Sequence, residues 1–209
     1  MLQQRYTTDK IECGCDEAGR GCLAGPVYAA AVVLPEGYEN DMLNDSKQLT
    51  ARKRDILREQ IEHDALAWAV ACIEPEEIDN MNILRASFHA MNLAVANLKV
   101  RPQMLLIDGN RFYNETDLPY QCIVKGDGKM MSIAAASILA KTHRDERMQQ
   151  LHELCPAYGW SKNKGYPTRD HYLAIEQYGI TPYHRKSFKL YRQLDFLEQL
   201  GDTQSKSVL

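Results

Sequence analysis

The sequence predicts an α/β fold, and three observations lead to this prediction. Short apolar runs with the composition of strands alternate with segments whose apolar residues recur every three or four positions. The chain has 209 residues, 44% of them hydrophobic, which is enough for one domain with a substantial core. Beyond the last strand-like run the patterns are helical, which predicts a helical C-terminal part.

Five strands are expected in the first part of the chain, over residues 11–16, 27–34, 65–73, 104–108 and 120–124. A glycine-rich turn follows the first of them, and Pro35 closes the second. Thr50 is a good N-cap for a helix over 51–63. Pro75 begins a short helical turn, and apolar residues at spacings of three and four predict a longer helix over 83–98.

The C-terminal part is expected to be mostly helical. Ser132 is expected to cap a helix that runs to Leu154, with its small residues close to the sheet and its charged half after Lys141 facing water. Further helices are expected over 168–178 and 189–200. We therefore divide the chain into a core of residues 1–155, a helical extension of residues 156–200 and a polar tail of residues 201–209.

The composition and the apolar pattern indicate where in the cell the protein is located. No apolar run approaches the roughly 18 residues that a membrane helix needs, and residues 1–6 lack the charged-then-apolar order of a signal peptide. Six cysteines are present, but Cys13-Gly14-Cys15 has no CxxC or histidine-rich partner set, so a zinc site is weakly indicated. We expect a cytoplasmic protein with reduced thiols and no membrane contact.

The charge is unevenly distributed. Residues 125–192 hold 12 Lys or Arg and 6 Asp or Glu, whereas the whole chain holds 25 and 28, for a net charge of −3. A basic C-terminal third on an acidic body is typical of a surface that faces phosphates. Solvated helix faces would give the same excess, so the charge alone leaves both interpretations open.

Four acidic residues carry the functional prediction. The adjacent pair Asp16-Glu17 lies beside Gly19 and Gly21, Asp108 ends the run Met104–Ile107, and Asp127 lies between two glycines. Carboxylates that converge at strand ends suit a hard divalent cation, and several together suggest two metals acting on a phosphodiester. Each acid alone could be a surface turn residue, since Asp and Gly are common in turns.

These motifs, taken in order, resemble those of bacterial ribonuclease HII. The resemblance covers residues 11–192 and is carried by motifs that begin at Asp16, Gly25, Asp45, Asp108, Lys125, Ser132 and Lys164. It implies an RNase H-like fold with a mixed central sheet flanked by helices, in which the C-terminal helical extension helps to grip the duplex. It also implies hydrolysis of the RNA strand of RNA/DNA hybrids and cutting on the 5′ side of single ribonucleotides in duplex DNA.

The resemblance implies the site residues as well. Asp16, Glu17, Asp108 and Asp127 would be the catalytic acids and the ligands of two Mg²⁺ or Mn²⁺ ions, with Asp16 bridging both ions. Neighbours on a strand point to opposite faces, so Glu17 reaches the same site only if a turn or bulge begins there. Asp127 could instead be a β-turn residue, because the fourth acid differs most between related nucleases.

Further residues would contact the substrate. The resemblance makes Gly19, Arg20 and Gly21 the sensor of a ribose 2′-hydroxyl, the group that distinguishes RNA from DNA. It places Tyr166 beside the nucleotide after the ribonucleotide, although a core tyrosine would fit the same position. Candidate phosphate contacts include Lys47, Lys164 and Arg185, which would give affinity rather than sequence choice.

Other interpretations stay open at this point. A junction resolvase or transposase-like nuclease of the same fold would keep the acids without needing a 2′-hydroxyl sensor. A catalytically silent duplex-binding module would not need the acids, and a small-molecule phosphatase would be expected to carry a phosphate-binding glycine loop. Residues 193–197 loosely resemble peptides that dock on the sliding clamp, although an amphipathic helix has the same pattern. We expect a monomer.

Overall fold

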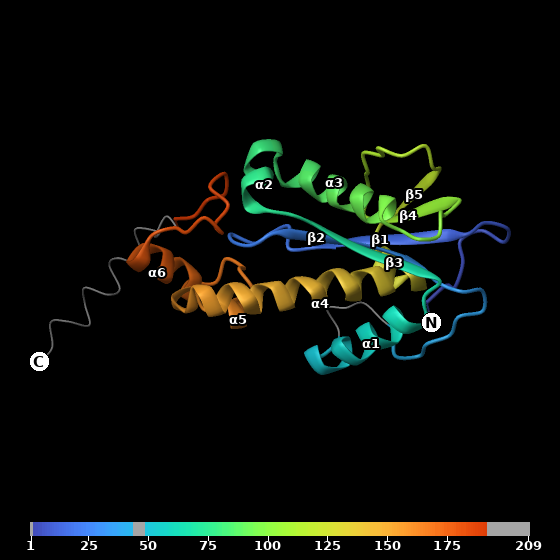
Figure 1. Ribbon diagram of the computed structural model, residues 1–209, viewed down its shortest axis with the longest axis horizontal. Helices are drawn as coiled ribbons and strands as arrows, with labels where there is room; N and C mark the ends of the chain where they lie inside the picture. Colours follow the sequence, from blue (N-terminus) through green and yellow to red (C-terminus); the bar gives the residue numbers. More distant parts are fainter. Residues whose placement is uncertain (1, 44–48, 192–209) are drawn as a thin grey trace, which may run out of the picture.

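The computed structural model describes residues 2–43 and 49–191 and is built on a five-stranded sheet (Figure 1). The strand order is β3-β2-β1-β4-β5. The strands are β1 (Glu12–Ala18), β2 (Val27–Val33), β3 (Ala67–Ile73), β4 (Met104–Asp108) and β5 (Tyr120–Ile123). Strand β2 runs antiparallel to β1 and β3, whereas β1, β4 and β5 are parallel, so the predicted mixed sheet is confirmed.

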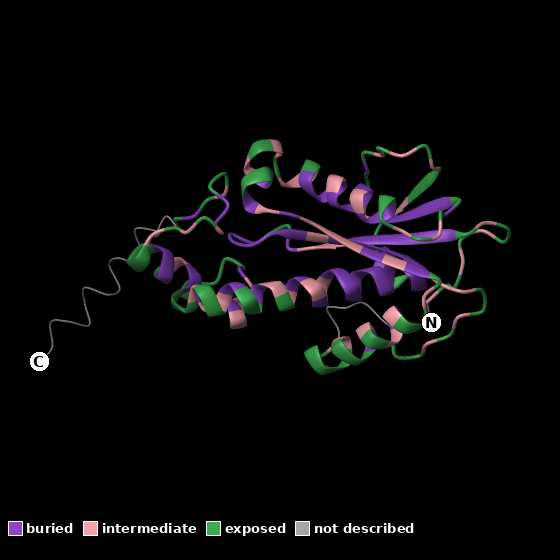
Figure 2. Cartoon of the chain, viewed as in Figure 1, coloured by how far each residue is buried: buried purple, intermediate pink, exposed green. Residues whose placement is uncertain are grey.

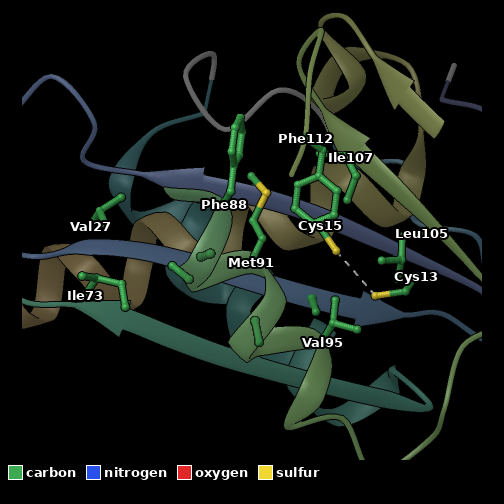
Figure 3. Packing of buried hydrophobic residues seen from close by; sticks show 14 of the residues in the cluster. Cys13, Cys15, Val27, Ile73, Phe88, Met91, Val95, Leu105, Ile107 and Phe112 are labelled. Carbon is green, nitrogen blue, oxygen red and sulfur yellow. Dashed lines mark hydrogen bonds between the residues drawn. The ribbon is translucent and has the colours of Figure 1, made fainter. Parts of the chain in front are cut away.

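Helices cover both faces of this sheet (Figure 1). Helices α2 (Pro75–Met81) and α3 (Ile83–Ala96) lie over one face, and α1 (Ala51–Asp64) and α4 (Met131–Leu154) lie over the other. On the α3 face, Phe88 and Met91 of α3 belong to the same buried cluster as Cys13 and Cys15 of β1 (Figure 3). The purple of buried residues runs along β1, β2 and the first half of α4 (Figure 2), so the sheet lies between two apolar layers.

Helix starts follow the local sequence. The Thr50 side chain accepts a hydrogen bond from the Lys53 amide at 3.3 Å and caps α1, as predicted. At α4 the prediction was wrong, because the helix begins at Met131 and Met130 is its N-cap. Ser132 lies inside the first turn instead, and its buried hydroxyl has no hydrogen-bond partner among the described residues.

Gly14 lets β1 and α4 approach each other more closely than a side chain would allow. A Cβ atom at Gly14 would lie 2.2 Å from the carbonyl carbon of Ser132, which is backbone and cannot move aside. From this contact α4 continues alongside β1, which brings Ser137 of the helix to Asp16 of the strand. The glycine therefore sets the position of the helix relative to the first acidic residue.

The chain after α4 forms a small lobe at the far end of that helix (Figure 1). It contains a 3₁₀ turn (Pro156–Tyr158), α5 (Trp160–Asn163), which the sequence patterns did not predict, and α6 (Arg169–Tyr178), which they did. Trp160 is fully buried in a separate core with Met148 of α4 and Ala24 of the loop after β1. The predicted helix over 189–200 is wrong at Lys189–Tyr191, which are not helical; the rest lies outside the described residues.

Two buried histidines link this lobe internally. The Trp160 indole N–H donates to Nε2 of His171 at 3.0 Å, and His171 Nδ1 donates to the Tyr166 carbonyl at 3.0 Å. His184 Nδ1 accepts from the Thr181 amide at 2.9 Å, and its Nε2 lies 3.3 Å from Nε2 of His171. Burial and the neighbouring His171 lower the pKa of His184 to about 4, and burial also lowers the pKa of His171.

These lowered pKa values predict an acid-sensitive lobe. A histidine that is neutral when folded but takes up a proton when unfolded makes the folded state less stable as the pH falls below the ordinary pKa. For His184 the loss should develop between about pH 6.5 and pH 4 and reach about 3 kcal/mol. We expect denaturant unfolding at several pH values to show this slope in the natural chain and a shallower slope in His184→Asn. The exposed His63 provides the control, and a His184→Asn slope equal to that of His63→Gln would contradict the assignment.

No helix among the described residues has both the length and the apolar content needed to cross a membrane. All six cysteines, including the close pair Cys13 and Cys15 with sulfurs 3.8 Å apart, are free thiols, as the sequence predicted.

Candidate active site

Asp16 and Asp108 lie next to each other on neighbouring parallel strands. Cys15 of β1 is in register with Ile107 of β4, and each aspartate follows its partner by one residue. Side chains alternate along a strand, so both aspartates project to the face that carries α4. The predicted convergence of acids at strand ends is therefore found for this pair.

The carboxyl group of Asp16 is in an unusual environment. It is 5% exposed, accepts a hydrogen bond from the Glu17 amide at 2.7 Å and lies beside Ser137. Burial raises the pKa of Asp16 well above its ordinary value, and the negative charges of Glu17 and Asp108 raise it further. Hydrogen bonds from Ser137 and the Glu17 amide oppose this rise only in part. The site therefore concentrates negative charge that a cation would stabilise.

Glu17 reaches the site from the other face of the sheet. Of the turn or bulge considered for this point, the structure has no bulge, because β1 continues in regular register through Glu17 opposite Ala29; the strand ends at Ala18 and a turn follows at residues 19–21. The Glu17 carboxylate borders an open hollow of ≈ 210 Å³ that Asp108 also lines, so the two acids meet at the edge of the sheet. Arg20 Nη1 binds Glu17 Oε1 at 2.7 Å and closes one side of this hollow.

Asp127 lies in a short 3₁₀ turn (Gly126–Gly128) just before α4. It is 4% exposed, which does not fit a solvated surface turn. The preceding residue, Gly126, donates its amide to Asp108 Oδ1 at 2.6 Å. The turn that carries Asp127 is therefore tied directly to the second aspartate of the site.

The donor atoms of this site are all carboxylate oxygens. Oxygen ligands suit Mg²⁺ and related hard cations, which need few carboxylates per ion. Among residues 2–43 and 49–191, no three His, Cys, Asp or Glu side chains are gathered tightly enough to form a metal-binding group as they stand. The acids match the cation in chemistry, and Glu17 is engaged by Arg20.

The loop after β1 carries the predicted hydroxyl sensor. Gly19 has a φ of 97°, in the left-handed region that favours glycine. Gly19 is buried, whereas Arg20 and Gly21 are exposed at the surface beside the acids. The exposed part of the loop thus lies next to the hollow, whereas Gly19 packs against the protein interior.

Tyr166 lies beside this loop, in contact with Cys22. Its side chain is 41% exposed, so it is not a fully buried core tyrosine. The phenol is hydrogen-bonded to the thiol of Cys22, and burial with the nearby Cys22 raises the pKa of Tyr166. Residues 19–21 and Tyr166, which are far apart in the sequence, are therefore joined through Cys22.

The basic residues differ in position. Lys164 is half-buried, and its left-handed backbone (φ 51°) precedes Gly165. Arg185 is 0% exposed, and its guanidinium donates to the carbonyls of Gly25 and Arg20 at 2.8 to 3.1 Å. Arg185 was expected to contact a phosphate, and this expectation is wrong. Its guanidinium group is enclosed by backbone carbonyls, so it supports the loop and does not reach a phosphate. Lys47 lies outside the described residues.

Two residues of this region were missed in the sequence analysis. Ser137 contacts Asp16, and Arg144 is buried where a water-facing helix surface was expected. The available signal was the helical spacing from Ile133 through Ser137 and Arg144 to Met148, which is one buried stripe.

Comparisons with solved structures identify the fold. The chain matches an Archaeoglobus fulgidus ribonuclease HII, solved as a complex with PCNA, with a TM-score of 0.74 and 24% identity over 90% of this chain and 99% of that one. It matches a ribonuclease HIII from Bst, solved in complex with Mn²⁺, with a TM-score of 0.66 and 19% identity over 86% of this chain and 67% of that one. The mixed sheet with helices on both faces is the RNase H-like fold.

Sequence comparisons identify the family within this fold. The family model for ribonuclease HII matches residues 13–191. A ribonuclease HII of Bacteroides thetaiotaomicron is 63% identical over 190 residues, which cover 91% of this chain and 95% of the relative. The chain belongs to the ribonuclease HII family. It is a hydrolase, an endoribonuclease with ribonuclease H activity on RNA/DNA hybrids.

Proposed function

We propose that this endoribonuclease also cuts on the 5′ side of single ribonucleotides embedded in duplex DNA, and leaves a 3′-hydroxyl and a 5′-phosphate. The observation that carries the proposal is that the acidic site around the buried Asp16 lies next to the loop of residues 19–21, which Cys22 joins to Tyr166. In the cell such cutting would begin the removal of ribonucleotides during DNA replication and repair.

The acids are proposed as ligands of two divalent ions, Mg²⁺ or Mn²⁺. When bound, such ions would supply the activation of a water molecule and the stabilisation of the leaving 3′ oxygen. Asp16, Glu17, Asp108 and Asp127 would hold these ions. The amide of Gly126 orients Asp108, and Ser137 orients Asp16. Glu17 becomes available to a cation when its ion pair with Arg20 opens.

The choice of ribonucleotides is proposed to come from the loop after β1 and from Tyr166. Backbone amides of Gly19, Arg20 and Gly21 would hydrogen-bond the ribose 2′-hydroxyl, which only RNA carries. The half-exposed Tyr166 ring would pack beside the next nucleotide and detect an RNA-to-DNA junction. We propose no base-reading element, so cutting would not depend on sequence.

Binding would rest on the basic C-terminal third. The segment 156–191 packs on the end of α4 and on the loop after β1, which supports its role as a substrate-binding extension of the core. Lys164 and Lys47 are proposed phosphate contacts, which would make binding sensitive to salt. A monomeric, cytoplasmic protein and a sliding-clamp contact of residues 193–197 remain predictions, and those five residues lie outside the described part of the chain.

A labelled DNA duplex with one ribonucleotide tests the proposal. With Mg²⁺ or Mn²⁺ we expect one cut on the 5′ side of the ribonucleotide, with a 3′-hydroxyl on the released end. An all-DNA duplex of the same sequence should stay intact, and an RNA/DNA hybrid is the positive control. Cutting of the hybrid but not of the single-ribonucleotide duplex would reject the proposed specificity and leave the hybrid activity in place.

A further inference from the structure

Arg144 is buried at the point where three segments meet. It lies on α4, is 1% exposed and extends between the loop after β1 and the loop before α6. Its Nε donates to the Pro26 carbonyl at 3.0 Å, Nη2 donates to the Ala24 carbonyl at 3.2 Å and Nη1 donates to the Lys164 carbonyl at 2.9 Å. One guanidinium group thus joins two loops that are more than a hundred residues apart in the sequence.

This arrangement depends on the shape of the guanidinium group. A buried charge is costly unless hydrogen bonds satisfy it, and Arg144 forms no salt bridge within the described ranges. Three carbonyls compensate the charge instead, through charge-assisted hydrogen bonds. Lysine has one compact ammonium group and cannot bind three carbonyls in this planar geometry.

Arg144 also touches both parts of the proposed ribonucleotide sensor. A Cβ atom at Gly19 would lie 2.0 Å from Arg144 Nε, so this glycine packs directly on the guanidinium group. The Tyr166 ring lies over the same group, with 5.9 Å between its centroid and Arg144 Cζ. This enclosed side chain therefore helps to set the distance between the glycine loop and the tyrosine, together with the Cys22–Tyr166 hydrogen bond and the bond from the Leu23 amide to the Gly165 carbonyl at 2.8 Å.

We propose that Arg144 is a positioning residue that determines selectivity for an RNA-to-DNA junction without contacting the substrate. The inference rests on the proposed function of Gly19–Gly21 and Tyr166. A junction is recognised only if the 2′-hydroxyl sensor and the tyrosine contact adjacent nucleotides at the same time. If one loop shifts relative to the other, the two contacts with adjacent nucleotides can no longer form together, while the acids stay in place.

Other anchors keep both loops folded when Arg144 is changed. Arg185 holds the glycine loop through the carbonyls of Gly25 and Arg20. His171 holds the Tyr166 carbonyl from the side of the C-terminal lobe. An Arg144 variant should therefore change the spacing between the loops more than it changes the fold.

The test compares Arg144→Lys and Arg144→Gln with the natural chain on two substrates, a single-ribonucleotide duplex and a long RNA/DNA hybrid. We expect kcat/KM on the single-ribonucleotide duplex to fall at least about tenfold more than on the hybrid, because small misplacements have large effects on reactive geometry. The hybrid offers a 2′-hydroxyl at every position, so it tolerates the shift. The neutral Gln variant avoids burying an ammonium group, and circular dichroism checks the fold of both.

Two further variants separate the possible failures. Arg147→Lys, one turn along the same helix and partly exposed, should leave the ratio between substrates unchanged. Tyr166→Ala should lose the preference for the junction. If Tyr166→Ala keeps that preference, the proposed sensor is wrong and the inference fails with it. The other outcome is that Tyr166→Ala loses the preference for the junction. In that case only the inference about Arg144 is overturned if both Arg144 variants keep the preference, lose both activities equally or fail to fold.

Discussion

Replacing Asp16 by Asn is expected to lower cleavage of an RNA/DNA hybrid by more than about a hundredfold, since even changes to groups around metal ligands cost 10- to 100-fold. The substitution preserves the shape of the side chain and its contact with the Glu17 amide, but it removes one negative charge from the centre of the acidic site. A cation held by the acids of this site would lose one carboxylate ligand. Initial rates at saturating Mg²⁺ and Mn²⁺ measure the effect.

The same substitution should stabilise the protein when no divalent ion is present. Burial and the charges of Glu17 and Asp108 raise the pKa of Asp16, so its charged form opposes folding at neutral pH. The neutral amide removes this opposition, and we expect the free energy of unfolding to rise by about 1 kcal/mol. The gain should shrink as the pH falls through the raised pKa towards the ordinary value near 4, because Asp16 itself then becomes neutral in the folded state.

Asp117→Asn is the matched control, because this exposed aspartate forms a surface ion pair with Arg101 and does not line the hollow beside Glu17 and Asp108. It should change neither cleavage nor stability appreciably. An Asp16→Asn variant that is both inactive and less stable than the natural chain would contradict the argument, since Asp16 would then be a structural residue whose charge helps the fold.

Local patterns in the sequence were sufficient for most elements of the sheet. The strand over 104–108 and the helix over 51–63 lie close to the observed β4 and α1, because each has a clear apolar pattern and α1 has its Thr50 cap. Asp108 ends its strand as predicted, and the parallel pairing of β1 with β4 brings Asp16 beside it. The motifs that resemble ribonuclease HII indicated the order of these elements, and the family is confirmed.

Tertiary contacts decided the features that the sequence did not predict. Arg144 and Arg185 look like solvated charges in the sequence, yet both are buried because distant backbone carbonyls surround them. Glu17 was expected to need a turn or bulge, but it lines the same hollow as Asp108 from a regular strand, at the carboxyl ends of β1 and β4. Neither arrangement leaves a local pattern, since it depends on which loops pack together after the sheet has formed.

Gly14→Ala is expected to destabilise the protein by at least about 3 kcal/mol, the upper range for overpacking a well-packed core. The added methyl group would lie 2.2 Å from the carbonyl carbon of Ser132 and 2.4 Å from the amide nitrogen of Ile133. Both atoms belong to the backbone at the start of α4, so relief requires the whole helix to move off β1. Urea unfolding at pH 7 measures the loss.

Activity should fall together with stability in Gly14→Ala, because displacement of α4 also moves Ser137 away from Asp16. Gly128→Ala is the matched control, since an added Cβ there meets nothing within 4 Å and the residue is exposed. If Gly14→Ala were as stable as Gly128→Ala, the strand and helix would have more freedom than the close contact implies. A stable Gly14→Ala variant with reduced cleavage would show instead that the helix can shift as a unit, and that the position of α4 relative to β1 affects catalysis separately from the fold.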